Sequence, residues 1–502
     1  MQTLDLSRSR QMLFTLLLLS PSLLGAQEEH RHSAPEKLGR VSFSTSCAPE
    51  IQEQFERGVA LLHSFVYATA EKAFRNVAER DPRCAMAHWG VAMTYFHQLW
   101  DPSVSPSTIP IALREIQVAQ QTGAKTERER EFIDALSLIY QDADSVAYRV
   151  RAANYERAMK DLASKNPKDT EVQVFYALAL LANESPTDKT HGKQKAAADL
   201  LEPLARAFPE HPGIPHYLIH AYDNAELASR GLPAAREYSK IASSAPHALH
   251  MPSHIFTRLG LWEDSIASNK AARDAAHRQG DTAEELHAMD YLVYAYLQLG
   301  RDSDAAQIVE QLKGMSRLNI ADSKSSYPTT AIPVRYVVER KQWAEAASTV
   351  PPTGAAPYVT AIAVWARGVG LSRSGRSGDA RLEADRLRQI GTQLRATGND
   401  YWATQVDVML REVLAWSAQA DGKAEEAVAM MREAADEEDG TEKLPVTPGP
   451  IVPAREQLAD LFLEQNHPGQ ASREFAASLA NSPGRRGALQ GAARAAELSS
   501  HK

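Results

Sequence analysis

The chain has 502 residues, of which 44% are hydrophobic and 24% are charged. It is therefore long enough for a large buried core, and its composition is that of a folded protein rather than a disordered one. The formal net charge is −8, and no stripe of basic residues able to neutralise phosphates occurs, which disfavours a nucleic-acid partner. The familiar phosphate-loop, nucleophile-elbow and H-E-x-x-H motifs are also absent from the sequence.

The first 26 residues have the pattern of an export signal. Arg8 and Arg10 precede an apolar run over 12–19, and the small residues Gly25 and Ala26 offer a cleavage site before Gln27. The apolar run is too short for a membrane span, although an uncleaved N-terminal anchor is an alternative. We therefore expect residues 1–26 to be a signal peptide, and the mature protein to be periplasmic or secreted and without a membrane span.

Residues 27–46 are polar and aperiodic, which predicts a flexible leader. The chain has two cysteines, Cys47 and Cys84, and each lies just before a predicted first helix of a pair. Neighbouring repeats place such starts side by side, and export favours disulfides. We expect a structural Cys47–Cys84 disulfide rather than a catalytic thiol.

The rest of the chain is predicted to be almost continuously helical. Apolar residues recur every three and four positions, glycine and proline separate the segments, and strand signals are nearly absent. The first hairpin, over 51–82, carries the tetratricopeptide (TPR) pattern, with Gly58 in its first helix and Phe74 in its second. These features predict an all-α fold, a TPR-like α-solenoid or superhelix of about nine helix pairs.

The regularity of the repeats changes along the chain. Gly260 and Gly300 mark equivalent turns, whereas later intervals stretch to about 40 residues. We therefore expect an N-terminal TPR array over 47–315 and a less regular, TPR-like C-terminal array over 316–502. A proline-rich loop is predicted near 444–450, because that many prolines cannot be accommodated in a helix.

Two histidine pairs repeat at the period of the TPR hairpin. His216 and His220 are followed, 34 residues later, by His250 and His254. Residues four apart share one face of a helix. Because neighbouring hairpins stack in register, the spacing predicts four imidazoles close together.

Aligning the hairpins on their turn glycines adds further residues to the same positions. His247 and His287 share one position, Asp290 falls in the position of His250, and Tyr294 falls in that of His254. All of these side chains are expected to face the concave groove of the array.

Four imidazoles suit Zn, Cu, Ni or Fe rather than Ca or Mg. Asp290 could replace one imidazole or accept a hydrogen bond from another. The predicted transition-metal ligands are therefore His216, His220, His250, His254 and Asp290. If three of them bind the ion, a position stays open for hydrolytic or oxidative chemistry, with Tyr294 or Asp223 near the reacting group.

Three other interpretations stay open. The imidazoles could line a peptide groove as hydrogen-bonding groups without a metal. His216 and His220 could pack or cap locally. Pro252 could break the helix and leave His250 in a loop.

A second pair of histidines, His63 and His97, is also 34 residues apart and is expected to face the groove. Trp89 is near His97 in the sequence, so it belongs either to an aromatic ligand pocket or to the core between helices. The full set assigned to the ligand groove is His63, His97, Trp89, Asp223, Tyr294, His247 and His287.

Several strings over residues 45–310 are more specific than a generic repeat. They include HYLIHAYD at 216–223 and PHALHMPSHIF at 246–256. These strings resemble a family of exported bacterial TPR proteins. The resemblance implies the fold and marks these segments, but it implies no particular activity.

Three functional hypotheses follow. The first is an exported TPR scaffold or binding protein whose groove holds a transition metal and a peptide or protein partner. The second is a metal-dependent hydrolase or oxidoreductase with its centre in the groove. The third is a metal-free adaptor between proteins. Whether the protein is an enzyme stays open at this point.

Overall fold

The computed structural model describes residues 36–99, 104–316 and 318–500. The chain divides into residues 1–36 and residues 37–502, and the fold and site below belong to the second unit. The predicted signal peptide over 1–26 lies outside the described residues. Among the described helices, none is both long enough and apolar enough to cross a bilayer.

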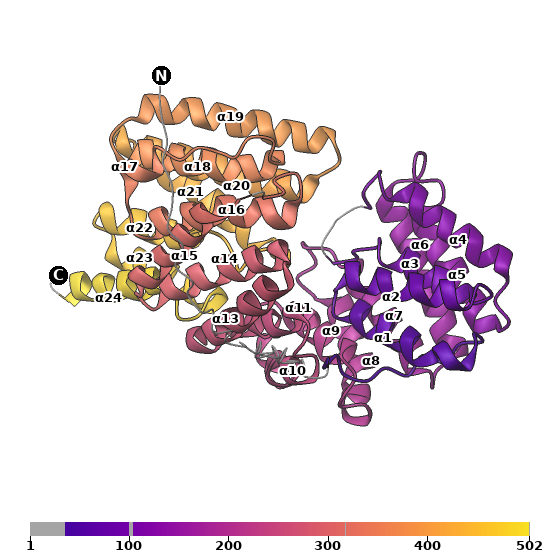
Figure 1. Ribbon diagram of the computed structural model, residues 1–502. Helices are drawn as coiled ribbons and strands as arrows, with labels where there is room; N and C mark the ends of the chain where they lie inside the picture. Colours follow the sequence, from indigo (N-terminus) through magenta and orange to yellow (C-terminus); the bar gives the residue numbers. More distant parts are fainter. Residues whose placement is uncertain (1–35, 100–103, 317, 501–502) are drawn as a thin grey trace, which may run out of the picture. The chain divides into compact units, whose positions relative to one another are not determined.

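The described part of the chain is all-α. It forms a short 3-10 helix, η1 (Pro49–Ile51), and 24 α-helices. Each helix packs chiefly against the helices next to it in the chain, so that successive helices lie side by side (Figure 1). This arrangement confirms the predicted TPR-like α-solenoid. The helices are more numerous than nine pairs require, partly because some pairs contain short or divided helices.

The first fifteen helices reach residue 314. They are α1 (Gln52–His63), α2 (Tyr67–Arg80), α3 (Ala85–Met93), α4 (Ile109–Thr122), α5 (Glu127–Tyr140), α6 (Tyr148–Lys165), α7 (Thr170–Ala182), α8 (Gly192–Ala207), α9 (Gly213–Tyr222), α10 (Ala228–Ile241), α11 (Pro246–His250), α12 (Pro252–Arg258), α13 (Trp262–Gln279), α14 (Thr282–Gln298) and α15 (Asp302–Gly314).

The last nine helices begin at residue 323. They are α16 (Ser323–Glu339), α17 (Trp343–Ala346), α18 (Pro357–Arg373), α19 (Ser377–Ala396), α20 (Asp400–Ala420), α21 (Ala424–Asp439), α22 (Ala454–Glu464), α23 (Pro468–Asn481) and α24 (Arg486–Ser500). The segment between α21 and α22 contains the predicted proline-rich loop and is not helical.

Equivalent turns keep the central hairpins in register. Gly260 and Gly300, two residues beyond α12 and α14, have φ of 69° and 70°. Glycine suits this left-handed position because it has no Cβ. In both turns the next amide donates back to a carbonyl five residues earlier, at 2.8 Å in each case. The same turn in two successive hairpins therefore gives their first helices the same placement.

The N-terminal end of the array is closed by a disulfide and by a packed, non-helical segment of the chain. Cys47 and Cys84 are bonded, as predicted. Phe43 is fully buried and contacts the rings of Trp89, Phe132 and Phe175. The described part of the segment predicted to be a flexible leader is thus packed, because its apolar residues fill the end of the core. Trp89 lies in that core rather than in a ligand groove.

Candidate metal centres

Six buried histidines form two groups of three. The first triad consists of His216 and His220 from α9 with His247 from α11. The second triad consists of His250 from α11, His254 from α12 and His287 from α14. In each triad, one ligand nitrogen per ring lies within 4.8 Å of the others.

The second triad repeats the first one, one hairpin further along. Each takes two histidines four residues apart from one first helix, and a third from the first helix of the next pair. The four predicted ligands His216, His220, His250 and His254 are therefore divided between two triads instead of forming one cluster. The reason is geometric: a histidine from the next first helix, His247 or His287, comes close to each pair. Where the triads adjoin, the rings of His220 and His254 are 6.1 Å apart between centroids.

Pro252 does not move His250 into a loop. His250 is the last residue of α11, and Met251 keeps helical dihedrals of φ −52° and ψ −35° before α12 begins. The backbone therefore stays helical through Pro252, and α11 and α12 are the two parts of one divided helix. His250 and His254 stay on one side of it, with their Nε2 atoms 3.0 Å apart.

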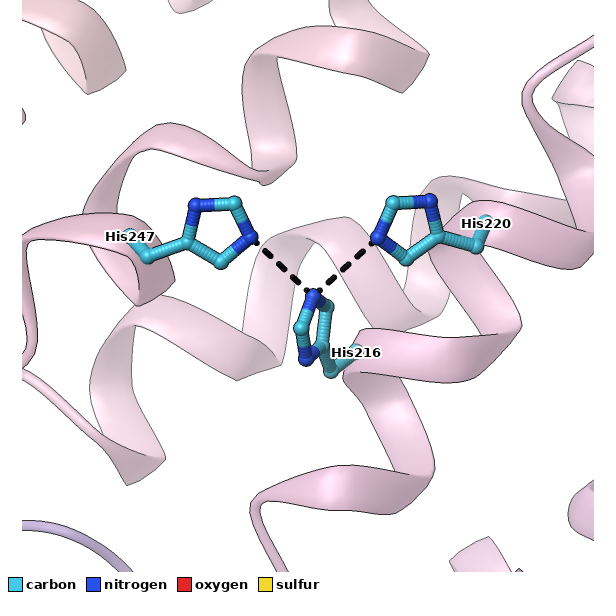
Figure 2. A group of neighbouring side chains, drawn as sticks. All are labelled: His216, His220 and His247. Atoms are coloured by element: carbon cyan, nitrogen blue, oxygen red, sulfur yellow. Dashed lines mark hydrogen bonds between the residues drawn. The ribbon is translucent and has the colours of Figure 1, made fainter. Parts of the chain in front are cut away.

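Contacts outside the first triad place a hydrogen on Nδ1 of His216 and of His247. Nδ1 of His216 is 2.6 Å from the carbonyl oxygen of His63, so Nδ1 must carry a hydrogen. Nδ1 of His247 lies 3.4 Å from one carboxylate oxygen of Glu284 and 3.3 Å from the other. In their neutral forms, both rings therefore present a bare Nε2. Figure 2 shows the Nε2 atoms of His220 and His247 directed at that of His216, each at 3.2 Å.

The second triad follows the same scheme. Nδ1 of His250 lies 2.6 Å from Oδ1 of Asn269, whose amide nitrogen donates to the carbonyl of Ser265. Nδ1 of His254 lies 2.8 Å from Oδ2 of Asp223. Since both acceptors require a hydrogen on Nδ1, the Nε2 lone pairs of His250 and His254 face each other across 3.0 Å.

Facing lone pairs need a cation between them. A proton is disfavoured, because burial lowers the pKa of four of these histidines well below its ordinary value and that of His254 to about 4. A transition-metal ion fits instead. Metal–nitrogen bonds of about 2.0–2.1 Å at tetrahedral angles separate the nitrogens by about 3.3 Å. The observed separations of 3.0–3.2 Å are close to that value.

Each centre is backed by one carboxylate that is itself neutralised. Asp223 accepts from Arg258 at 2.9 Å and from Lys443 at 2.7 Å, while Glu284 is paired with Lys324. Burial alone would raise the pKa of both acids, but these cations hold it well below the ordinary range. Both carboxylates are therefore ionised acceptors that orient a ligand histidine.

A third buried group, His63, Glu171 and His211, is saturated without a metal. The amide of Gly213 donates to Nδ1 of His211, so Nε2 of His211 donates to Glu171 at 2.8 Å. His63 donates from Nε2 to the other oxygen of Glu171 and accepts from the hydroxyl of Tyr217, each at 2.9 Å. Every ring nitrogen has a matched partner here. We therefore interpret this group as a structural hydrogen-bond network rather than a metal site.

Asp290 lies outside both triads. Its Oδ1 is 3.1 Å from Nε of Arg335, and both side chains are fully buried. Arg335 comes from α16, in the next hairpin. The hairpin that carries Asp290 therefore contacts a cation of the following hairpin, whereas each of the two earlier hairpins contacts a histidine of the following hairpin. Asp290, predicted as a metal ligand, thus belongs to neither triad and forms a buried ion pair.

The remaining groove residues also separate from the triads. The hydroxyl of Tyr294 accepts from Arg485 at 3.1 Å, and the ring of His97 stacks on Tyr67 at 4.2 Å. His63 supports the first triad through its carbonyl oxygen rather than through its ring. Because the six triad histidines are at most 9% exposed, they do not line an open groove.

Sequence reasoning missed the residues that surround the triads. Asn269 and Glu284 carry no motif, although Glu284 lies three residues before His287 and so shares its face of α14. Phe65 and Tyr291 lie against the two triads. Of these, Tyr291 could have been noticed four residues after His287.

No protein-family model and no curated protein matches the chain. Among solved structures, it is similar to the P58(IPK) TPR domain, with 13% identity, 90% of this chain and 99% of that one covered, and a TM-score of 0.22. For the Cut9–Hcn1 hetero-tetramer of the APC/C, the identity is 11%, the match covers 89% of this chain and 76% of that one, and the TM-score is 0.36. For yeast Tom70, the identity is 11%, the match covers 90% of each chain, and the TM-score is 0.31.

Proposed function

We propose that the protein is a transition-metal-binding protein that holds two adjacent three-histidine centres in a TPR-like array. One observation supports this most directly. In each triad two Nε2 lone pairs face each other at 3.0–3.2 Å, while the Nδ1 hydrogens are engaged by acceptors on the outside. Three imidazole nitrogens suit Zn, Cu, Ni or Fe.

We extend the proposal to location and partner. The export predicted from residues 1–26 would place the protein in the periplasm or outside the cell, and the Cys47–Cys84 disulfide supports an oxidising compartment. A peptide or protein partner is proposed from the TPR-like fold, because stacked helix pairs offer extended binding surfaces. In this proposal the metal and the partner occupy different places, since the triads are buried.

The test is metal content after reconstitution. Protein stripped by a chelator and incubated with a mixture of zinc and copper ions is expected to retain two ions per chain in elemental analysis. His216→Ala and His250→Ala should each retain one ion, and the double variant none.

His277→Ala is the matched control, because this exposed histidine contacts Glu285 on the surface and neither triad. It should retain both ions. A folded wild-type protein that retains no ion, or triad variants that keep two, would contradict the proposal.

A further inference from the structure

A segment between α21 and α22 is held by other parts of the chain, as a bound peptide would be. Residues 441–453, here called the strap, contain four prolines and no helical residue. Residues 446–449 within the strap are buried. An extended segment lacks helical hydrogen bonds of its own, so its buried main-chain groups need partners elsewhere.

Side chains from three distant helices supply those partners. They are Tyr401 of α20, which accepts from the amide of Leu444 at 3.1 Å, Tyr291 of α14, which donates to the carbonyl of Thr447 at 3.2 Å, and Arg335 of α16, which donates to the carbonyls of Gly449 and Pro450 at 3.4 Å and 3.1 Å. Bonds to the main chain do not depend on the side chains of the strap. Another extended segment would therefore make the same bonds on this surface.

Charged side chains fix the position of the strap along the surface. Nζ of Lys443 lies 2.7 Å from Oδ2 of Asp223, and both side chains are less than 10% exposed. The neighbouring Glu442 is paired with Lys189 and lies 3.5 Å from Arg258. The surface thus offers one anion for a lysine and two cations for an adjacent acid.

The strap does not fill the surface completely. A cavity of about 140 Å³ lies between residues 447–453 on one side and Tyr327, Trp402 and Met409 on the other. Protein interiors are otherwise closely packed, and a space of this size accommodates a benzene-sized ring. Ile451 lines the cavity, so an aromatic side chain in its place would fit the surface better than isoleucine does.

We propose that the surface under the strap, defined by Asp223, Tyr291, Arg335 and Tyr401, binds the peptide partner, and that the strap occupies it until the partner displaces it. This inference rests on the peptide partner proposed above and not on the metal. The partner is an extended, proline-containing segment with a lysine for Asp223 and an aromatic side chain for the cavity.

The covalent link favours the strap over a free peptide. A tethered segment competes at an effective concentration in the millimolar range, and its prolines reduce the entropy lost on docking. A peptide at micromolar concentration should therefore bind the wild-type protein weakly. Once the strap is detached, the same peptide should bind more tightly.

The experiment titrates a fluorescent peptide with the sequence of residues 441–453 into the full-length protein, in the presence of a chelator. Lys443→Glu places a second anion beside Asp223 and should detach the strap. This variant should bind the peptide at least tenfold more tightly than the wild type. Lys423→Glu is the matched control, because this exposed lysine pairs with Glu426 at the start of α21 and should leave the wild-type affinity unchanged.

Peptide variants test the two features assigned to the partner. In the titration of Lys443→Glu protein, a peptide that itself carries Lys443→Glu should bind at least tenfold more weakly than the original peptide. A peptide that carries Ile451→Phe should bind at least tenfold more tightly, since its ring fills the cavity. A peptide of the same composition in scrambled order should not bind.

Hydrogen exchange of the wild-type protein gives a measurement that needs no protein variant. Saturation with the Ile451→Phe peptide should speed exchange of the Leu444 amide in the chain at least tenfold, because its bond to Tyr401 is lost. Exchange in α19, outside the surface, should not change. If Lys443→Glu fails to fold, unchanged exchange of Leu444 in the peptide-saturated wild type would overturn the inference.

The outcomes separate this inference from the proposed function. A folded Lys443→Glu protein that binds the strap peptide no better than the wild type would overturn the docking surface, and so would equal binding of the peptide with glutamate. Metal content is measured independently, and a chain that retains two ions but takes no peptide refutes only the docking surface. A chain that takes the peptide but retains no ion refutes only the metal centres.

Discussion

Nδ1 of His216 donates to the backbone carbonyl oxygen of His63 across 2.6 Å. This contact joins the first triad to the saturated network of His63, Glu171 and His211. A ligand on α9 is thus oriented by the end of α1, which is far away in the sequence. In the proposed metal centre, this network would act through position, because it fixes the ring of His216 without supplying a ligand.

Gly213 is expected to be intolerant of a side chain for this reason. A Cβ at this position would lie 2.7 Å from Nδ1 of His63. Gly213→Ala should therefore displace His63, lower the free energy of unfolding by about 1–3 kcal/mol, and weaken metal binding at the first triad. The control is Gly378→Ala, also near a helix start, where no atom lies within 4 Å. Urea unfolding and metal titration check both effects, and equal behaviour of the two variants would contradict the prediction.

Loss of the carboxylate behind the second triad should weaken that centre alone. Asp223→Asn leaves Lys443 and Arg258 without their common anion and weakens the acceptor for His254. We expect metal affinity at the second triad to fall about 10–100-fold, with the first triad unchanged. Glu226→Gln removes a partly exposed acid paired with Lys195 and should have no effect. Competition titrations with a chelator of known affinity measure the change.

Asp290 should matter for stability and not for metal content. Asp290→Asn leaves the fully buried Arg335 without its counter-ion, which costs about 3–5 kcal/mol in free energy of unfolding. The exposed pair of Arg376 and Asp379 gives the comparison, since Asp379→Asn should cost less than about 1 kcal/mol. Chemical denaturation measures both costs. Loss of an ion in folded Asp290→Asn would restore the aspartate as a ligand.

Glu438 should make stability fall at alkaline pH. Burial raises the pKa of this acid, whose carboxylate accepts from the first amide of α22 at 2.8 Å, from 4.5 to about 8. The folded state thus holds a proton that the unfolded state releases above pH 4.5. This contribution to stability is complete below pH 4.5 and is lost as the pH rises through about 8.

Glu438→Gln cannot ionise, so its unfolding midpoint in urea should fall less than that of the wild type between pH 5.5 and 8.5. Glu433→Gln, at an exposed position of α21, should keep the wild-type slope. Parallel pH profiles for all three proteins would exclude a contribution from Glu438.

The disulfide should stabilise the fold without affecting the metal centres. Cys47 and Cys84 close a loop with a sequence separation of 37, for which chain entropy gives about 4 kcal/mol. The double variant Cys47→Ser, Cys84→Ser is expected to lose free energy of unfolding by this order while retaining two ions per chain. Thermal unfolding and elemental analysis test the two statements separately. A lost ion would mean that the disulfide end of the array holds the first triad in place.

The repeat period gave the fold class and the importance of the histidines, because both depend on spacing along the chain. His216 and His250 do occupy equivalent positions, and so do His220 and His254. The sequence could not rank distances across neighbouring hairpins. That ranking depends on how far each helix is shifted along its neighbour, and it decided that His247 and His287 complete the triads.

The partners of the histidines were harder to predict, since they come from distant parts of the chain. Lys443 reaches Asp223 from the segment after α21, and Phe65 reaches the first triad from the end of α1. Neither contact has a spacing rule. The alignment of the hairpins predicts Asp290 as a ligand. In the structure Asp290 pairs with a cation instead, because Arg335 of α16 lies next to it.

Each triad draws on two successive helix pairs, so an ion held there would act as a cross-link between neighbours that otherwise touch through packed side chains and ion pairs such as Asp223–Arg258. Two such links follow one another from α9 to α14. This stretch would then be mechanically the stiffest of the array, and a molecule pulled from its ends should separate its hairpins elsewhere first.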